Sequence, residues 1–209
     1  NVWTAVQAYR TPSGIRAVIA RLKEHRALVT GGNRVKKLVR VAGRSHWRLF
    51  IPANTSPLHV PFLKGELNRL VPHNSGGHEL AVVFLSVTKK CTLKCEHCFE
   101  WDNLNQKEVI GPEDINRMIE NLQSIGATNI AFTGGEPMVR TREMAESIRR
   151  YKSKSQFWIL TSGFNFSATN AAELRSAGAH GVVVSIDHHD ALLHDQFRGV
   201  QGSFRDAIT

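Results

Sequence analysis

The three cysteines of this chain lie together in CTLKCEHCFEW, residues 91–101, where Cys95 follows Cys91 by four positions and Cys98 follows Cys95 by three. An odd number of cysteines suits a structural disulfide framework poorly, because one thiol is left over. Structural zinc sites usually have four ligands in paired C-x2-C knuckles, so zinc would need His97 as its fourth ligand and stays an alternative. Three thiolates can also hold an iron-sulfur cube, in which one iron keeps an open coordination position for chemistry.

The motif Cys91-x3-Cys95-x2-Cys98 resembles the cluster-binding motif of the radical S-adenosylmethionine (radical SAM) superfamily, in the style of the branch that includes the molybdenum-cofactor cyclase and peptide-modifying maturases. The resemblance covers residues 80–209. It implies a [4Fe-4S] cluster on the three cysteines, with S-adenosyl-L-methionine (SAM) at the open iron. It also implies that one electron, from a donor such as flavodoxin or ferredoxin, cleaves SAM to a 5′-deoxyadenosyl radical that abstracts hydrogen from a substrate.

Strands and helices are predicted to alternate after Leu80. Strands are expected at 81–87, 129–133, 157–161 and 181–186, and helices at 113–125, 141–152 and 168–177. Such alternation predicts βαβ units and a parallel sheet. With the resemblance, it predicts an α/β fold: a partial (βα) TIM-like barrel of about four units, preceded by a small basic α+β N-terminal module. The expected division is residues 1–79 for the module with its linker and residues 80–209 for the radical SAM core.

The final segment, GSFRDAIT, is expected to form the first turns of the fourth helix. The barrel of the family usually continues through two more strands, and an unpaired strand edge is unfavourable. We therefore expect the native protein to be longer, with substrate contacts and any auxiliary clusters in the additional part.

Polar and glycine-rich segments fall where the predicted strands end. The cysteines follow the first strand, TGGEP at 133–137 follows the second, TSG at 161–163 follows the third, and SID at 185–187 ends the fourth. Because the carboxyl ends of parallel barrel strands form one rim, where ligands bind, these segments are predicted to meet in a single site.

The resemblance assigns cofactor contacts to several of these residues. Gly134, Gly135 and Glu136 match the Gly-Gly-Glu-Pro motif that meets the methionyl amine of SAM. His97 stands where the family often has an aromatic residue near the adenine. For the glycines, an ordinary tight turn is the alternative.

Further contacts are implied at the third and fourth strands. Ser162, Ser185 and Asp187 could hydrogen-bond the ribose or the methionyl carboxylate, with polar capping of strand ends as the alternative. Arg198, in HDQFRGVQGSF, matches an arginine that meets the SAM carboxylate, and a guanidinium suits this group because it donates two parallel hydrogen bonds. No residue is assigned to catalysis itself.

Two other groups of polar residues are interpreted as non-catalytic. DHHDALLHD, residues 187–195, has three histidines and three aspartates, but its spacing matches no zinc motif, so we expect a polar loop that helps to position Arg198. Glu100 and Asp102, beside the cysteines, are expected to be solvated acids.

The charge of the chain is concentrated near its N-terminus. Residues 1–80 contain 13 Lys and Arg against 3 acids, a net charge of +10, whereas residues 81–209 contain 14 against 15. A helix is predicted at 15–29, a hairpin at 37–51 with its turn near Ala42-Gly43, and an irregular linker at 52–77 with a short helical piece at 63–70.

A basic surface of this kind is compatible with several roles. A solvated face, a docking surface for a peptide or protein substrate, and an RNA clamp all stay open, although no nucleic-acid fold signature is present. A non-catalytic iron-sulfur or zinc protein is the remaining alternative. With 42% hydrophobic residues, no apolar run long enough for a membrane helix and no signal-peptide pattern, the chain is expected to be globular and cytoplasmic, without a membrane partner.

Overall fold

The computed structural model describes residues 2–30, 39–41, 43–46, 49–73, 80 and 82–209. Its contacts define two compact units, residues 1–82 with 122–128, and residues 83–121 with 129–209. Among the described helices, none is both long enough and apolar enough to span a membrane.

Four strands form the sheet of the second unit, in the order β3 (Val82–Ser86), β4 (Asn129–Thr133), β5 (Gln156–Thr161) and β6 (Gly181–Val184). The β4–β5 and β5–β6 pairs are parallel. The N–H of Val87, just beyond β3, donates to the carbonyl of Thr133 at 2.9 Å, so the carboxyl ends of β3 and β4 meet. All four strands therefore end at one edge of the sheet.

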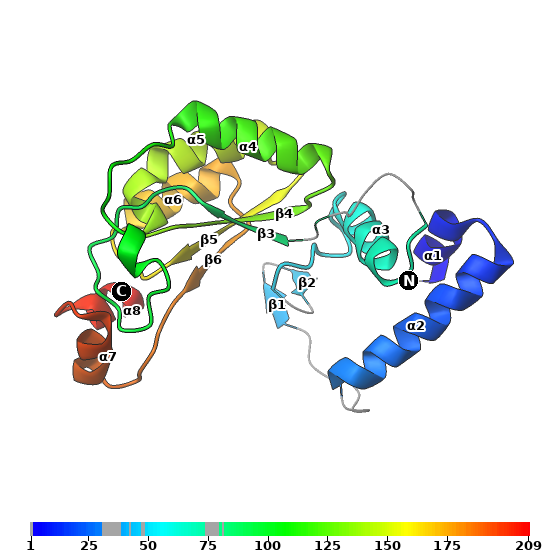
Figure 1. Cartoon of the computed structure of the whole chain (residues 1–209), viewed down its shortest axis with the longest axis horizontal. Helices are drawn as coiled ribbons and strands as arrows, with labels where there is room; N and C mark the ends of the chain where they lie inside the picture. The colour runs from blue at the N-terminus through cyan, green and yellow to red at the C-terminus, as the bar shows by residue number, and fades with distance from the viewer. Residues whose placement is uncertain (1, 31–38, 42, 47–48, 74–79, 81) are drawn as a thin grey trace. The chain divides into compact units, whose positions relative to one another are not determined.

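The helices between these strands are α4 (Pro112–Ser124), α5 (Thr141–Tyr151) and α6 (Ala168–Ala177), and they lie on the same side of the sheet (Figure 1). A consecutive strand order with helices on one side is the arrangement of a (βα) barrel, whereas a doubly wound sheet reverses its order and carries helices on both faces. The predicted α/β fold, a partial barrel of parallel strands, is confirmed.

The core of this unit lies between the sheet and the three helices. Phe132 on β4 stacks on Phe157 on β5 with ring centroids 5.4 Å apart. The other large apolar side chains that are fully buried in this unit are Ile115, Ile119, Ile130, Met138, Met144, Ile148, Ile159 and Leu174. Burial of each such side chain contributes about 1.5–3 kcal/mol to stability. The core therefore stabilises the sheet whose strand ends carry the site.

The N-terminal unit is built from three helices, α1 (Val2–Tyr9), α2 (Pro12–Thr30) and α3 (His59–Leu70), and a short hairpin of β1 (Val39–Val41) and β2 (Arg44–His46). Tyr9, Val18 and Leu67 share one buried cluster. The Tyr9 hydroxyl lies 2.7 Å from the carbonyl of Leu67 and 2.6 Å from that of Val71, which fastens α1 to the end of α3.

The predicted N-terminal helix and hairpin are present, whereas one helix was predicted too short and another was missed. Helix α2 begins at Pro12, three residues before the predicted start, because proline is favoured at the first helical position. The supposedly irregular linker contains all of α3, in which Pro61 is tolerated because the first turn makes no intrahelical N–H bonds. The hairpin is confirmed at β1 and β2, with Gly43 at φ +76° between them. Residues 37–38 and 47–48 of the hairpin, Ala42 of its predicted turn and residues 74–77 of the predicted linker lie outside the described residues. Helix α1 was not predicted.

Two short helices follow β6, namely α7 (Ala191–Arg198) and α8 (Ser203–Ile208). The predicted polar loop at 187–195 is therefore wrong in its second half. The Asp190 carboxylate accepts hydrogen bonds from the N–H groups of Leu192 and Leu193, at 2.9 and 3.1 Å, and this N-cap starts α7. Strand β6 ends at Val184, so Ser185 and Asp187 lie beyond the strand.

Candidate active site

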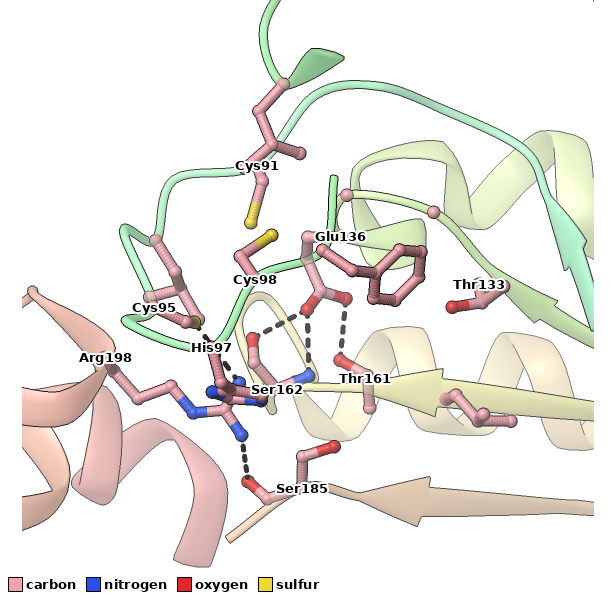
Figure 2. Close-up of a pocket in the computed structure, with 16 residues that line it drawn as sticks. Cys91, Cys95, His97, Cys98, Thr133, Glu136, Thr161, Ser162, Ser185 and Arg198 are labelled. Atoms are coloured by element: carbon pink, nitrogen blue, oxygen red, sulfur yellow. Dashed lines mark hydrogen bonds between the residues drawn. The ribbon is translucent and has the colours of Figure 1, made fainter. Parts of the chain in front are cut away.

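A cavity of about 230 Å³ lies at the carboxyl ends of the four strands, and Figure 2 shows the residues around it. Ten of the eleven predicted site residues line it, and Asp187 does not. The lining residues are Cys91, Leu93, Cys95, His97, Cys98, Phe99, Leu104, Thr133, Gly134, Gly135, Glu136, Leu160, Thr161, Ser162, Ser185 and Arg198.

The three cysteines lie on the long loop between β3 and α4, residues 87–111, which contains the short helix η1 (Trp101–Asn103). All three are free thiols. In Figure 2 the side chains of Cys91 and Cys98 point toward one another. Burial raises the pKa of the Cys91 thiol, and the nearby Glu136 carboxylate acts in the same direction, against a hydrogen bond from the Leu93 backbone. A metal that binds Cys91 must therefore displace a proton.

The paired glycines seat this loop on the end of β4. A Cβ on Gly134, whose φ is +139°, would lie 2.4 Å from the carbonyl oxygen of Thr88, and a Cβ on Gly135 would lie 2.3 Å from that of Lys90. The N–H of Gly135 donates to Thr88 at 2.9 Å, and the N–H of Glu136 donates to Lys90 at 2.7 Å. In this structure the absence of side chains at 134 and 135 serves the close approach of the cysteine loop.

The Glu136 carboxylate, which is 1% exposed, connects the ends of β4 and β5. One oxygen accepts from the Thr161 hydroxyl at 2.6 Å and from the Met138 N–H at 3.0 Å. The other accepts from the N–H and the hydroxyl of Ser162, at 2.9 and 2.6 Å (Figure 2). A carboxylate has about four lone-pair sites, so protein donors use its full capacity. The contact of Glu136 with the methionyl amine stays a prediction.

The Arg198 side chain enters the cavity from the end of α7 and is 8% exposed. Its Nε forms an ion pair with Asp187 at 2.5 Å, and its two terminal nitrogens lie 3.5 Å from the Cys95 sulfur and 3.4 Å from the Ser185 carbonyl oxygen. Asp187 thus acts on the site through Arg198. His194, which is buried, accepts from the Asp187 N–H through Nδ1 at 3.2 Å and fixes that residue.

The end of α7 also holds the middle of the cysteine loop. The N–H groups of Lys94 and Glu96 donate to the carbonyls of Arg198 and Phe197, at 2.9 and 3.0 Å. The His97 ring stacks on Phe197 with centroids 4.9 Å apart and planes inclined by 16°. His97 is therefore placed at the rim of the cavity by an aromatic partner that the sequence did not reveal.

The chemistry of the donors fits an iron-sulfur cluster. Among the described residues, no three or more His, Cys, Asp or Glu side chains converge as the ligands of a single metal ion would. A cubane cluster makes a different demand, since thiolates hold it through separate iron atoms. The structure is thus that of an α/β protein with three free cysteines around one cavity at the rim of a partial barrel and a guanidinium beside one of them.

The chain belongs to the radical SAM superfamily, whose family model matches residues 85–209. Members of this superfamily are enzymes that use a [4Fe-4S] cluster and SAM and need an electron donor. The predicted recognition and cofactors are thus confirmed at the level of the family.

Several known proteins are similar to this chain over part of their length. An AdoMet-dependent heme synthase from Oleidesulfovibrio alaskensis is 30% identical over 146 residues, or 69% of this chain and 37% of that protein. A GTP 3′,8-cyclase from Marinobacter nauticus is 34% identical over 128 residues, or 59% of this chain and 37% of that protein. The crystal structure of Streptococcus suis SuiB aligns with a TM-score of 0.48 and 15% identity, over 96% of this chain and 42% of SuiB. The chain thus spans well under half the length of these relatives.

Proposed function

We propose that Cys91, Cys95 and Cys98 hold a [4Fe-4S] cluster, that SAM binds in the adjoining cavity, and that the protein abstracts hydrogen from its substrate. The observation that carries this proposal is that three free thiols line the same cavity as the residues at the ends of β4, β5 and β6. When bound, the cluster and SAM supply reductive cleavage of the sulfonium and a 5′-deoxyadenosyl radical.

The residues of the chain would bind and orient SAM. Arg198 can direct its terminal nitrogens at a carboxylate, while its ion pair with Asp187 holds the guanidinium from the Nε side. Ser162 and Ser185 can hydrogen-bond the ribose or the carboxylate, and His97 can lie against the adenine. The apolar side chains that line the cavity, Leu93, Leu104 and Leu160, would limit the access of water.

A single anaerobic assay tests this proposal. The chain is reconstituted with iron and sulfide, reduced, and mixed with SAM, and 5′-deoxyadenosine is measured by mass spectrometry. We expect product from the wild-type chain and none from Cys95→Ala. A loaded, reducible cluster that gives no product in either protein would contradict the proposal and favour the alternative of a non-catalytic iron-sulfur protein.

We infer that the substrate is a peptide or protein that docks on the basic N-terminal unit. Residues 1–80 carry a net charge of +10, and Arg16, Arg21 and Lys23 on α2 are exposed. An acidic segment is the partner that such a field would attract. The proposed electron donor is a flavodoxin or a ferredoxin, and the proposed compartment is the cytoplasm, where thiols stay reduced.

An RNA substrate is the second candidate, because the same exposed positive charges would attract a phosphate backbone. Binding of this kind falls steeply as salt is raised. The affinity of the chain for a short RNA, measured by fluorescence anisotropy between low and physiological salt, separates the candidates. RNA binding that is absent or insensitive to salt would exclude the hypothesis that the basic unit is an RNA clamp.

A further inference from the structure

Asn105 lies in the returning half of the cysteine loop and pairs with the first cysteine. Its side-chain nitrogen donates to the carbonyl of Cys91 at 2.9 Å, and its side-chain oxygen accepts from the N–H of Cys91 at 3.1 Å. Its own N–H donates to the carbonyl of Lys89 at 2.8 Å. One amide side chain thus satisfies both backbone groups of a cysteine 14 positions away, as a neighbouring strand would.

The backbone of Asn105 is in the left-handed region, with φ +60°. This conformation is uncommon for residues other than glycine, and asparagine is among the few that tolerate it. The left-handed turn, the side-chain pair and the bond to Lys89 occur together at this residue. The side-chain amide is therefore held in place from two sides, by its own backbone and by the outgoing half of the loop.

Glu108 makes a second connection between the two halves of the loop. Its carboxylate accepts from the Thr88 hydroxyl at 2.6 Å and from the Lys89 N–H at 3.2 Å. Thr88 is buried, and its carbonyl accepts from the N–H of Gly135. Residues 88–91 thus lie between Gly134-Gly135 on one side and the returning half of the loop on the other.

We propose that Asn105 is a positioning residue for the cluster, because it fixes the backbone that carries the Cys91 thiol. This inference rests on the proposed binding of the cluster by the three cysteines. Partners that orient a metal ligand without touching the metal typically change metal affinity by about 10- to 100-fold when they are removed. Arg198 and the end of α7 hold the loop at Cys95 and its neighbours, so the loss of Asn105 would act at the Cys91 corner.

The test uses Asn105→Gly, which removes the amide and keeps a residue that adopts positive φ without strain. The matched control is Asn165→Gly, because Asn165 is also left-handed, at φ +58°, and its side chain bonds to Met138 instead of the cysteine loop. Both variants and the wild-type chain are reconstituted with ferrous iron and sulfide. The measurements are iron per chain, the rate of iron transfer to a strong chelator, the EPR spectrum of the reduced cluster, and the thermal midpoint.

We expect Asn105→Gly to lose iron to the chelator about 10-fold faster than wild type and to show altered g-values, while Asn165→Gly matches wild type in both. Asn105→Asp keeps the acceptor for the Cys91 N–H, so its rate of iron loss should fall between those of wild type and Asn105→Gly. This variant also provides the test if Asn105→Gly does not fold. A loaded wild-type chain with indistinguishable Asn105 variants would overturn this inference alone. A wild-type chain that takes up no cluster would overturn the proposed function, and the inference with it.

Discussion

At the scale of single residues, Glu136 has a structural role that the sequence motif does not indicate. The sequence motif predicts that Glu136 contacts the cofactor. In the structure, its carboxylate accepts hydrogen bonds from Thr161, Ser162 and Met138. Such a group holds two strand ends in a fixed relation. A substitution of Glu136 should therefore destabilise the rim of the sheet even when no ligand is bound.

We predict that Glu136→Gln lowers the free energy of unfolding of the apoprotein by about 1–3 kcal/mol, because the amide nitrogen would face donors that lose their acceptor. The measurement is chemical denaturation in the absence of iron and SAM. Glu146→Gln, an exposed site on α5, is the control and should be nearly neutral. Unchanged stability in Glu136→Gln would show that the rim tolerates the loss of these bonds.

Asp195 provides a prediction on pH. The N–H groups of Gly202 and Phe204 hold the pKa of its carboxyl below the ordinary value, against the effect of burial and together with the Ser203 hydroxyl. A lowered pKa in the folded state gives stability that is present above about pH 4, the ordinary value, and is lost as the pH falls further.

Asp195→Asn should therefore be less stable than wild type at pH 7, and the difference should shrink as the pH is lowered below about 4. Thermal unfolding of both proteins over that range measures the effect. Asp102→Asn, at an exposed position in η1, controls for the change in net charge. A difference that stays constant with pH would rule out the carboxylate as its cause.

At the scale of elements, the conformation of the cysteine loop depends on its contacts with the end of β4. Gly135 is not in the left-handed region, so a side chain there is opposed by its neighbours and not by its backbone conformation: a Cβ would meet the Lys90 carbonyl and lie 3.1 Å from the Cys91 Cβ. The end of β4 and the loop therefore form one packed unit.

We predict that Gly135→Ala displaces the loop, costs about 1–3 kcal/mol of stability as overpacking does, and lowers the iron bound per chain. Gly111→Ala is the matched control, because its added Cβ would make only an ordinary contact, 3.5 Å from Asp114. Denaturation and iron analysis of the two variants decide the matter. Equal iron content in both would mean that the loop can shift without loss of the site.

Hydrophobic and turn patterns were sufficient to predict the four strands, the helices between them and their common rim. They predicted α3 too short and α1 not at all, because short helices depend on tertiary partners such as Tyr9 with Leu67. Among the site residues, those at strand ends were identifiable from their position. Asn105 and Phe197 were not, since nothing in a single sequence signals a contact between a loop residue and a cysteine 14 positions earlier, or between a helix end and His97.

At the scale of the whole molecule, charge is divided between the two parts of the chain. The first 80 residues are strongly basic, and the remainder is close to neutral. We attribute the proposed docking of an acidic peptide to exposed basic residues on α2. The effect of these residues can be distinguished by experiment from the effect of the net charge of the chain.

We predict that Arg16→Glu with Lys23→Glu weakens the binding of an acidic peptide by roughly 3- to 10-fold, since exposed charge pairs contribute about 0.2–1 kcal/mol each. Cleavage of SAM without peptide should be unchanged. The control, Arg142→Glu with Lys154→Glu, makes the same change in net charge at exposed sites in the second unit. Anisotropy titrations that show the same loss in both pairs would exclude docking on α2.

The bonds between the cysteine loop and the end of α7 have a consequence for the synthesis of the protein. Cys95 leaves the ribosome 103 residues ahead of Arg198, the residue that lies beside its thiol. At about 5–20 residues per second, the thiols wait for several seconds before α7 can fold against them. The nascent chain therefore presents three free cysteines before α7 can fold against them. If these cysteines hold the proposed cluster, we expect stable iron binding only after translation of residue 199, whose left-handed glycine packs against Lys94.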